Sequence, residues 1–404
     1  MNLPAMLSGA ELATALQILP EVHHELRQED AATRLIALSD LYQVYVPSQM
    51  SMEIYSKLYL SLLRSMQKKG TLEAVRQRYE NHRAIQQQSC SGIIGGSDSF
   101  TIIGGSGIGK STAISRALSL ISENRIIQPK GSISKVIPFL TVQCPFDSSV
   151  KGLLLEILRK VDEVLNTTYS ISAQKARTTT DMLVGSVSSV CLNHIGLLVV
   201  DEIQNVVASK NGRNLIGALT QLINSSGISI CMVGTPECTV FFEQAMQMAR
   251  RSVGLQYTAL PYDDYFQAVC EILWQYQYVQ QSSELTPATV HWLYEHSAGV
   301  ISIVVSLVHD AQEIAILEGT EQLNIESLTK AYQQRLAFLH GYIQPSITLA
   351  KQTSTAKKRS GIPFANAVPD EEKSITQWVA WAKEAGMDIA KVLSEHFTVE
   401  EISL

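Results

Sequence analysis

Charged side chains are scarce in this sequence. Asp, Glu, Lys and Arg make up 17% of its 404 residues, whereas about a quarter is usual for soluble domains. A chain with so few charges and with 46% hydrophobic residues can bury a core, so disorder along its whole length is excluded. At about 100–200 residues per domain, the length leaves room for two or three structural units.

Long apolar runs and paired cysteines are also missing. The best candidate for a run of the roughly 18 apolar residues that cross a bilayer, 299–317, is interrupted by His309, Asp310 and Glu313. The first residues lack the basic-then-apolar pattern of a signal sequence. The six cysteines are far apart without a CxxC pair, so neither a zinc site nor a disulfide framework is indicated. We therefore expect a cytoplasmic protein with reduced thiols and no membrane partner.

Four segments follow one another along the chain. Residues 1–95 show helical spacing of apolar residues, with Pro47 and Ser48 as a turn and helix cap. Residues 96–260 alternate short apolar runs with helical stretches, which is typical of a parallel α/β sheet. Residues 261–345 are again helical. Residues 346–404 begin with a flexible basic linker and then carry a short aromatic helix, which we interpret as a partner-binding tail.

Five strands are expected in the α/β segment, at 100–103, 136–142, 196–200, 229–233 and 255–260. The helices expected between them cover 111–122, 150–164, 181–193, 215–224 and 238–250. In the following segment we expect helices at 265–278, 287–296, 301–317 and 325–338. The charged stretch 68–82 is expected to be exposed.

A glycine-rich motif follows the first expected strand and precedes a helix. The pattern G-x-x-x-x-G-K-[ST] is matched at every fixed position by Gly104, Gly105, Ser106, Gly107, Ile108, Gly109, Lys110 and Ser111, with Thr112 next. Backbone N–H groups of such a loop surround the phosphates of a nucleotide, and its lysine reaches the β- and γ-phosphates. The serine hydroxyl joins the Mg²⁺ shell. The loop therefore predicts a nucleotide bound with Mg²⁺.

Further candidates for catalysis follow later strands. Asp201 and Glu202 end the third strand, where Asp201 is expected to hold the metal and Glu202 to polarise the attacking water. Thr235, after the fourth strand, either contacts that water or is a plain turn residue. Arg250 and Arg251 end a helix, where cations are favourable in any case. Alternatively, one of them enters the site of a neighbouring subunit, which requires an oligomer.

The order of these motifs resembles that of AAA+ ATPases, with a phosphate loop, an acidic pair, a polar strand end, an arginine pair and a helical lid. More narrowly, residues 30–345 resemble the TnsC/TniB family of transposition regulators, of the Tn7-like or CRISPR-associated transposon type. The motifs that carry this resemblance are 45–47, 104–112, 199–205, 233–237, 250–251 and 260–262. It implies a five-stranded P-loop NTPase core with a helical N-terminal leader and an all-α lid.

The resemblance also implies a function. Members of this family are ATPases that assemble as rings or helical filaments on double-stranded DNA, with hexamers or heptamers as possible rings. They recruit transposase subunits to a site chosen by a targeting protein or an RNA-guided complex. The implied ligands are ATP and Mg²⁺, and the implied location is the bacterial nucleoid. Residues 45–52 are a candidate for the base pocket, although they contain no decisive motif.

The resemblance places DNA contacts after the second strand. The candidates there are Lys151, Lys175, Arg177 and Thr179, with ordinary surface residues as the alternative. Many AAA+ lids carry an arginine shortly after a glycine, but no arginine follows Gly299 closely. This departure implies slow hydrolysis, which suits an assembly switch.

Two other functions fit the motifs. A signalling or antiviral P-loop switch would bind protein partners only, and the sequence contains no zinc finger, helix-turn-helix or basic arm. A helicase-loader-like AAA+ ATPase would need a DNA-binding module after the lid. Charge favours DNA binding by the core, because residues 96–260 carry 14 basic and 11 acidic residues, whereas 261–345 carry two and ten.

Overall fold

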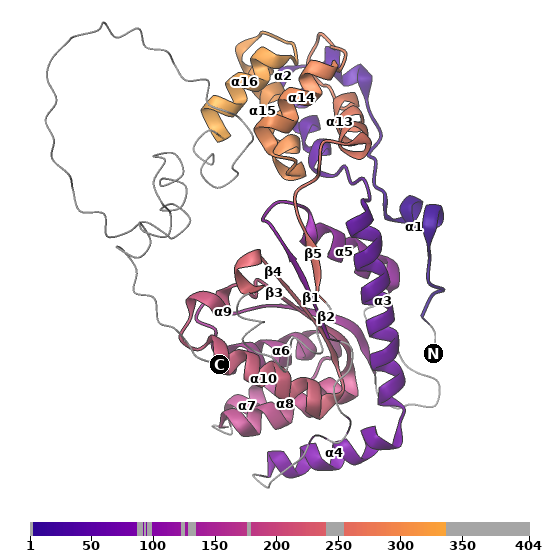
Figure 1. Ribbon diagram of the computed structural model, residues 1–404, viewed down its shortest axis with the longest axis vertical. Coiled ribbons are helices and arrows are strands. Elements are labelled where there is room, and N and C mark those ends of the chain that lie inside the picture. The colour runs from indigo at the N-terminus through magenta and orange to yellow at the C-terminus, as the bar shows by residue number, and fades with distance from the viewer. Residues whose placement is uncertain are drawn as a thin grey trace, which may run out of the picture. The chain divides into compact units, whose positions relative to one another are not determined.

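The structure is a computed structural model. It describes residues 3–86, 92, 94, 99–122, 126–127, 135–175, 179–239 and 254–336 (Figure 1). The chain divides into two compact units, Met1–Thr348 and Leu349–Leu404, and every described residue belongs to the first. The expected tail and most of the expected helix 238–250 lie outside the described residues.

A five-stranded sheet lies at the centre of the α/β segment (Figure 1). Its strand order is β2-β3-β4-β1-β5, and every neighbouring pair is parallel. The strands are β1 (Phe100–Gly104), β2 (Ile137–Gln143), β3 (Ile195–Asp201), β4 (Ser229–Gly234) and β5 (Leu255–Tyr257). The predicted parallel α/β fold is confirmed. The fifth strand is shorter than expected, because its partner β1 ends at Gly104, which pairs with Tyr257.

Helices cover both faces of this sheet and produce two separate cores. Along β3, Leu198 and Val200 belong to one core, whereas Leu197 and Val199 belong to the other, as the alternation of side chains in a strand requires. The first core is completed by α6 (Val150–Leu165), α8 (Thr180–His194) and α10 (Gly212–Ser226). The second is completed by α1 (Gly9–Leu16), α3 (Gln49–Lys69) and α5 (Lys110–Ile121).

Three further helices lie around the α/β segment: α4 (Leu72–Ile85), α7 (Tyr169–Lys175) and α9 (Asn205–Ala208). The expectation that 68–82 is exposed is wrong for one face of α4. Ala74, Gln77 and Asn81, which share a helix face, are buried, and the Asn81 amide donates to the Ser225 carbonyl at 2.9 Å. Small and amide side chains can be buried when their polar groups are hydrogen-bonded.

A helical bundle follows β5. It consists of α13 (Asp264–Gln275), α14 (Pro287–Ser297), α15 (Ile301–Glu318), α16 (Ile325–Ala331) and the π-helical turn η4 (Tyr332–Leu336). Thr286 caps α14 by accepting from the Thr289 amide, and Pro287 occupies the first turn as expected. Within the described ranges no single helix is long and apolar enough to cross a membrane. Only α14 and α15 together, bent by 119°, meet those criteria.

The first part of the chain is shared between these two bodies. Its segments η1 (His24–Gln28), α2 (Ala31–Ala37) and η2 (Leu38–Tyr42) precede α3. Leu38 and Leu41 are buried in the core of the helical bundle, whereas α3 packs on the sheet. Ser48 caps α3 by accepting from the Ser51 amide, as predicted.

A buried ion pair fastens the leader to the bundle. The Arg34 guanidinium, 3% exposed, contacts both carboxylate oxygens of Glu321 at 2.5 and 2.8 Å. It also donates to the Tyr278 carbonyl at 3.3 Å. These hydrogen bonds from Arg34 hold the pKa of Glu321 below its ordinary value. Two charges removed from water in this way stabilise the fold only while both are present.

We expect Arg34→Ala to lower the free energy of unfolding by about 3 kcal/mol, because Glu321, only 14% exposed, is then largely removed from water without its cation. Urea denaturation followed by circular dichroism measures this loss. The stabilisation exists above the ordinary glutamate pKa and disappears as pH falls through the lowered folded-state pKa of Glu321. The difference between variant and wild type should therefore shrink in acid.

Arg159→Ala is the matched control, since Arg159 forms exposed ion pairs with Glu156 and Glu163 on α6. Surface pairs contribute little, so this variant should unfold like the wild type. If Arg34→Ala lowers the free energy of unfolding no more than Arg159→Ala does, the Arg34–Glu321 pair does not stabilise the fold as described.

Candidate nucleotide-binding site

The glycine-rich loop connects β1 to α5, as predicted. Gly107 and Gly109 have φ of +79° and +96°, a region that favours glycine. A Cβ added to Gly104 would lie 2.5 Å from the Ile108 side chain and 2.8 Å from the Tyr257 carbonyl. Residues with larger side chains at these positions would strain this backbone. The glycines therefore let the loop curl closely, as a phosphate-binding loop requires.

Lys110 is the first residue of α5. Its ammonium donates to the carbonyls of Gly104 and Gly105, both at 2.7 Å. Partial burial lowers the pKa of Lys110, and the charges of Asp201 and Glu202 oppose that shift. A partly buried cation beside a curled backbone is suited to bind the oxygens of a polyphosphate.

The two predicted metal residues lie together. The Ser111 hydroxyl is 3.4 Å from a carboxylate oxygen of Asp201. The other carboxylate oxygen of Asp201 accepts from the Glu202 amide at 2.8 Å. A hydroxyl and a carboxylate are oxygen ligands of the kind that Mg²⁺ prefers, with water and phosphate oxygens completing its shell. The residues present therefore fit this metal.

Glu202 has an unusual backbone for a residue with a side chain. Its φ is +56°, a conformation found at functional sites where the surrounding structure enforces it. The Gln204 amide donates to the Glu202 carboxylate, while the Gln204 Oε1 atom is buried and has no hydrogen-bond partner among the described residues. Gln204 thus holds the predicted catalytic carboxylate, a role that sequence spacing did not indicate.

Thr235 directly follows β4, the strand that lies between β3 and β1. Since the carboxyl ends of parallel strands meet at one edge, Thr235 is placed between the acidic pair and the phosphate loop. Its hydroxyl donates to Glu237 at 2.9 Å, so both interpretations of this threonine stay open. Arg250 and Arg251 lie outside the described residues.

A cavity of about 900 Å³ adjoins the phosphate loop. Three distant parts of the chain line it, namely the leader, the connection from β5 to α13 and the start of α15. Thr112 and residues of the candidate base pocket 45–52 contribute to its wall. Tyr257 donates to Glu53 at 2.9 Å, and Tyr265 donates to the Val46 carbonyl at 2.9 Å. A mostly apolar cavity with a few fixed polar groups is suited to a planar base.

Residues 95–258 match the family model described as "Bacterial TniB protein". Over this segment the chain is similar to TniB proteins. The resemblance predicted from the motifs is confirmed over these residues, which include the phosphate loop and the acidic pair. No curated protein matches the chain.

Solved structures similar to the chain include the following three proteins. The Aeropyrum pernix Orc1 protein in complex with DNA is 16% identical over 65% of this chain and 64% of its own, with a TM-score of 0.41. Domain III of Thermotoga maritima DnaA is 11% identical over 68% and 94%, with a TM-score of 0.35. A Thermotoga maritima RuvB mutant is 11% identical over 92% and 88%, also with a TM-score of 0.35.

The lid contacts the phosphate loop of this TniB-like segment through backbone atoms. The Ser302 amide, in the first turn of α15, donates to the Gly107 carbonyl at 3.4 Å. Gly299 has φ of +75°, and a Cβ added there would lie 2.0 Å from the Leu260 carbonyl. Where many AAA+ lids carry an arginine, this chain therefore has a close backbone contact that glycine permits.

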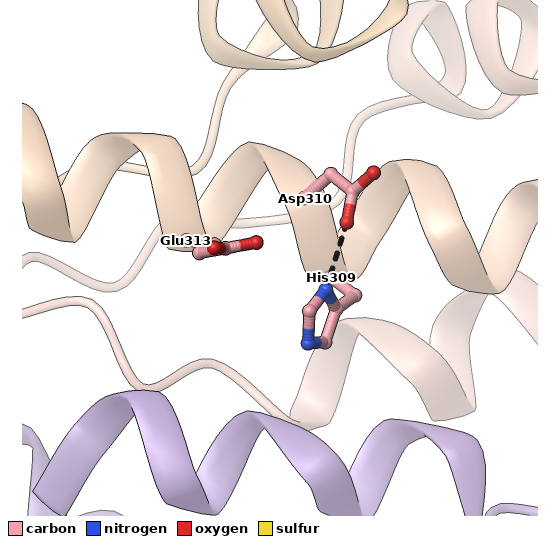
Figure 2. A group of neighbouring side chains, drawn as sticks. All are labelled: His309, Asp310 and Glu313. Carbon is pink, nitrogen blue, oxygen red and sulfur yellow. Dashed lines mark hydrogen bonds and ion pairs between the residues drawn. The ribbon is translucent and has the colours of Figure 1, made fainter. Parts of the chain in front are cut away.

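The two cations of the lid are engaged elsewhere. Figure 2 shows His309, Asp310 and Glu313 on α15, whose ligand atoms lie within 4.8 Å of one another. The Arg335 guanidinium pairs with both carboxylates, at 3.0 Å from Asp310. This cation engages both carboxylates and offsets one of their two charges, so we assign no metal site to the cluster. Lys330 pairs with Glu318.

The predicted DNA contacts are spread over several elements. Lys151 is exposed near the start of α6. Lys175 is the last residue of α7, and Arg177 lies outside the described residues. Thr179 caps α8 by accepting from the Met182 amide at 3.4 Å. The hydroxyl of Thr179 thus has a structural partner, while the role of these residues on DNA stays a prediction.

We expect Gly299→Ala to destabilise the fold and to weaken binding of a fluorescent ATP analogue, because its methyl group would collide with the Leu260 carbonyl. Gly319→Ala is a matched control with the same φ of +75° and no neighbour within 4 Å of its added Cβ. The new alanine has a left-handed backbone in both variants. The difference between the two variants in free energy of unfolding, about 1–3 kcal/mol, therefore measures the collision. Equal thermal stability and equal analogue affinity of the two variants would contradict the close lid contact.

Proposed function

We propose that this protein is an ATP-dependent regulator of DNA transposition. It oligomerises on double-stranded DNA and links target-site selection to recruitment of transposase subunits. The observation that carries the proposal is the TniB match over residues 95–258, the segment that holds the phosphate loop and the acidic pair. The targeting partner is either a protein or an RNA-guided complex, and the place of action is the bacterial nucleoid.

The site residues divide the work of hydrolysis. The phosphate loop and Lys110 bind and orient the triphosphate of ATP, while Ser111 and Asp201 would hold Mg²⁺. That ion, when bound, neutralises charge on the β- and γ-phosphates. Glu202 accepts a proton from the attacking water, and Thr235 orients that water. Release of Glu202 from Gln204 precedes this step.

Completion of the site requires a second subunit. We propose that Arg250 or Arg251 enters the neighbouring site and stabilises charge in the transition state. Such an arrangement makes hydrolysis depend on assembly as a ring or filament. Because both lid cations are paired within the lid, hydrolysis is slow and serves as an assembly switch.

The proposed division of labour follows the predicted segments. Residues 96–260 form the ATPase core and carry the DNA contacts, with Lys151, Lys175, Arg177 and Thr179 as candidates. Residues 1–95 and 261–345 form the leader and lid that enclose the base. Residues 346–404 form the tail that binds the transposase.

Two variants separate nucleotide binding from hydrolysis. Lys110→Ala should abolish binding of a fluorescent ATP analogue and ATP-driven assembly on duplex DNA, because the triphosphate loses its cation. Glu202→Gln should bind ATP and assemble, while hydrolysis falls by about 10²-fold or more through loss of the base. Electron microscopy with duplex DNA and a phosphate-release assay provide the two measurements.

Lys160→Ala is a suitable control, since Lys160 is a lysine of α6 whose ammonium donates to the Thr141 carbonyl, away from the phosphate loop. It should assemble and hydrolyse ATP like the wild type. Normal assembly of Lys110→Ala with ATP and duplex DNA would refute the proposed function.

A further inference from the structure

Phe146 is the most exposed large apolar side chain among the described residues, with 89% of its surface accessible. It lies in the loop between β2 and α6. Val207 of α9, close to the same loop, is 46% exposed. Exposure of an aromatic ring to water is unfavourable, and neither the fold nor the nucleotide site uses Phe146.

The loop around Phe146 is held on both sides. Before it, the Cys144 carbonyl accepts from the Asn205 amide at 2.9 Å. After it, the Asp147 carbonyl accepts from the Ser209 hydroxyl at 2.9 Å, and the buried Ser148 hydroxyl donates to the Asn205 carbonyl at 3.1 Å. Phe146 therefore lies on a loop that hydrogen bonds hold in place, so its exposure does not result from a loosely attached loop.

Three cations surround this loop. Lys151 lies in the first turn of α6, while Lys210 and Arg213 lie around the start of α10. All three are exposed, and no ion pair involves them within the described part of the chain. The first turns of α6 and α10 contain no acidic residue. Cations at helix N-termini are electrostatically unfavourable, so an anionic partner would offset a cost present in the isolated chain.

We propose that Phe146 inserts against the bases of duplex DNA from a groove, while Lys151, Lys210 and Arg213 contact the phosphates on either side. Apolar side chains inserted in this way unstack base steps, and flanking cations supply affinity without base specificity. The inference rests on the proposed function and identifies the contact surface, adding Phe146, Lys210 and Arg213 to the residues expected from the sequence.

A protein partner fits this surface less well. Stable protein interfaces have a contiguous apolar centre, whereas here Phe146 and Val207 are the exposed apolar side chains beside three cations. Asp147, exposed beside Phe146, is the one acidic residue of the loop between β2 and α6, so the three cations leave this surface with an excess of positive charge. An aromatic ring on such a surface is complementary to a polyanion with stacked rings.

The test compares the binding of a fluorescent duplex by variants of the full chain, in the presence of an ATP analogue and over a series of salt concentrations. Phe146→Ala should raise Kd about five- to tenfold, through loss of a ring–base contact, and leave the dependence of log Kd on log salt unchanged. Lys151→Ala and Arg213→Ala should each reduce that slope by about one, as loss of a phosphate contact requires.

Leu72→Ala is the matched control, because Leu72 is an apolar residue of α4 that is 76% exposed. It should bind duplex DNA like the wild type. Binding of the ATP analogue by every variant reports that the core is folded.

The outcomes separate this inference from the proposed function. If the wild type binds duplex DNA with ATP and Phe146→Ala binds it as tightly, the inference is wrong and the proposed function stands. If the wild type does not bind duplex DNA, the proposed function itself fails. If Phe146→Ala impairs ATP-driven self-assembly in the absence of DNA, the ring packs on a second copy of the chain, which overturns the inference.

Discussion

Strands that are buried on both faces can carry polar chemistry only where they end. β1 and β4 are buried along their whole length, and β3 is buried up to Asp201. Because the strands are parallel and adjacent, the first polar residues after each one meet at the same edge. The phosphate loop, the acidic pair and Thr235 all depend on this constraint, although they are widely separated in the sequence.

The lid and the leader complete the site by a different route. The leader is fastened to the lid by the buried Arg34–Glu321 pair and then continues into α3, which packs on the sheet. The chain therefore passes twice between lid and core, once near Pro47 and once between β5 and α13. The cavity beside the phosphate loop lies between these two passages. A change in how the lid meets Gly107 would consequently alter the cavity wall on both sides.

The acidic motif also reaches beyond the nucleotide site. Asn205, which ends it, bonds to the loop that displays Phe146, and the Cys144 amide donates to the Asp201 carbonyl at 2.8 Å. The carboxylates proposed for hydrolysis and the ring proposed for DNA contact thus belong to one hydrogen-bonded segment. In this arrangement, the state of the nucleotide and the contact with DNA share a short structural connection.

The sequence by itself determined the parallel α/β fold, the phosphate loop and the acidic pair, because each depends on local spacing: apolar runs, glycines with positive φ and polar residues at strand ends. Only the tertiary structure decided which side chains are already engaged within the fold and which are available to bind a partner. The buried face of α4 and the ion pairs of Arg335 depend on neighbours far along the chain. The hydrogen bond from Gln204 to Glu202 and the exposure of Phe146 depend on the conformation of loops. Residue type states what a side chain can bind, whereas packing decides whether a partner within the fold already occupies it.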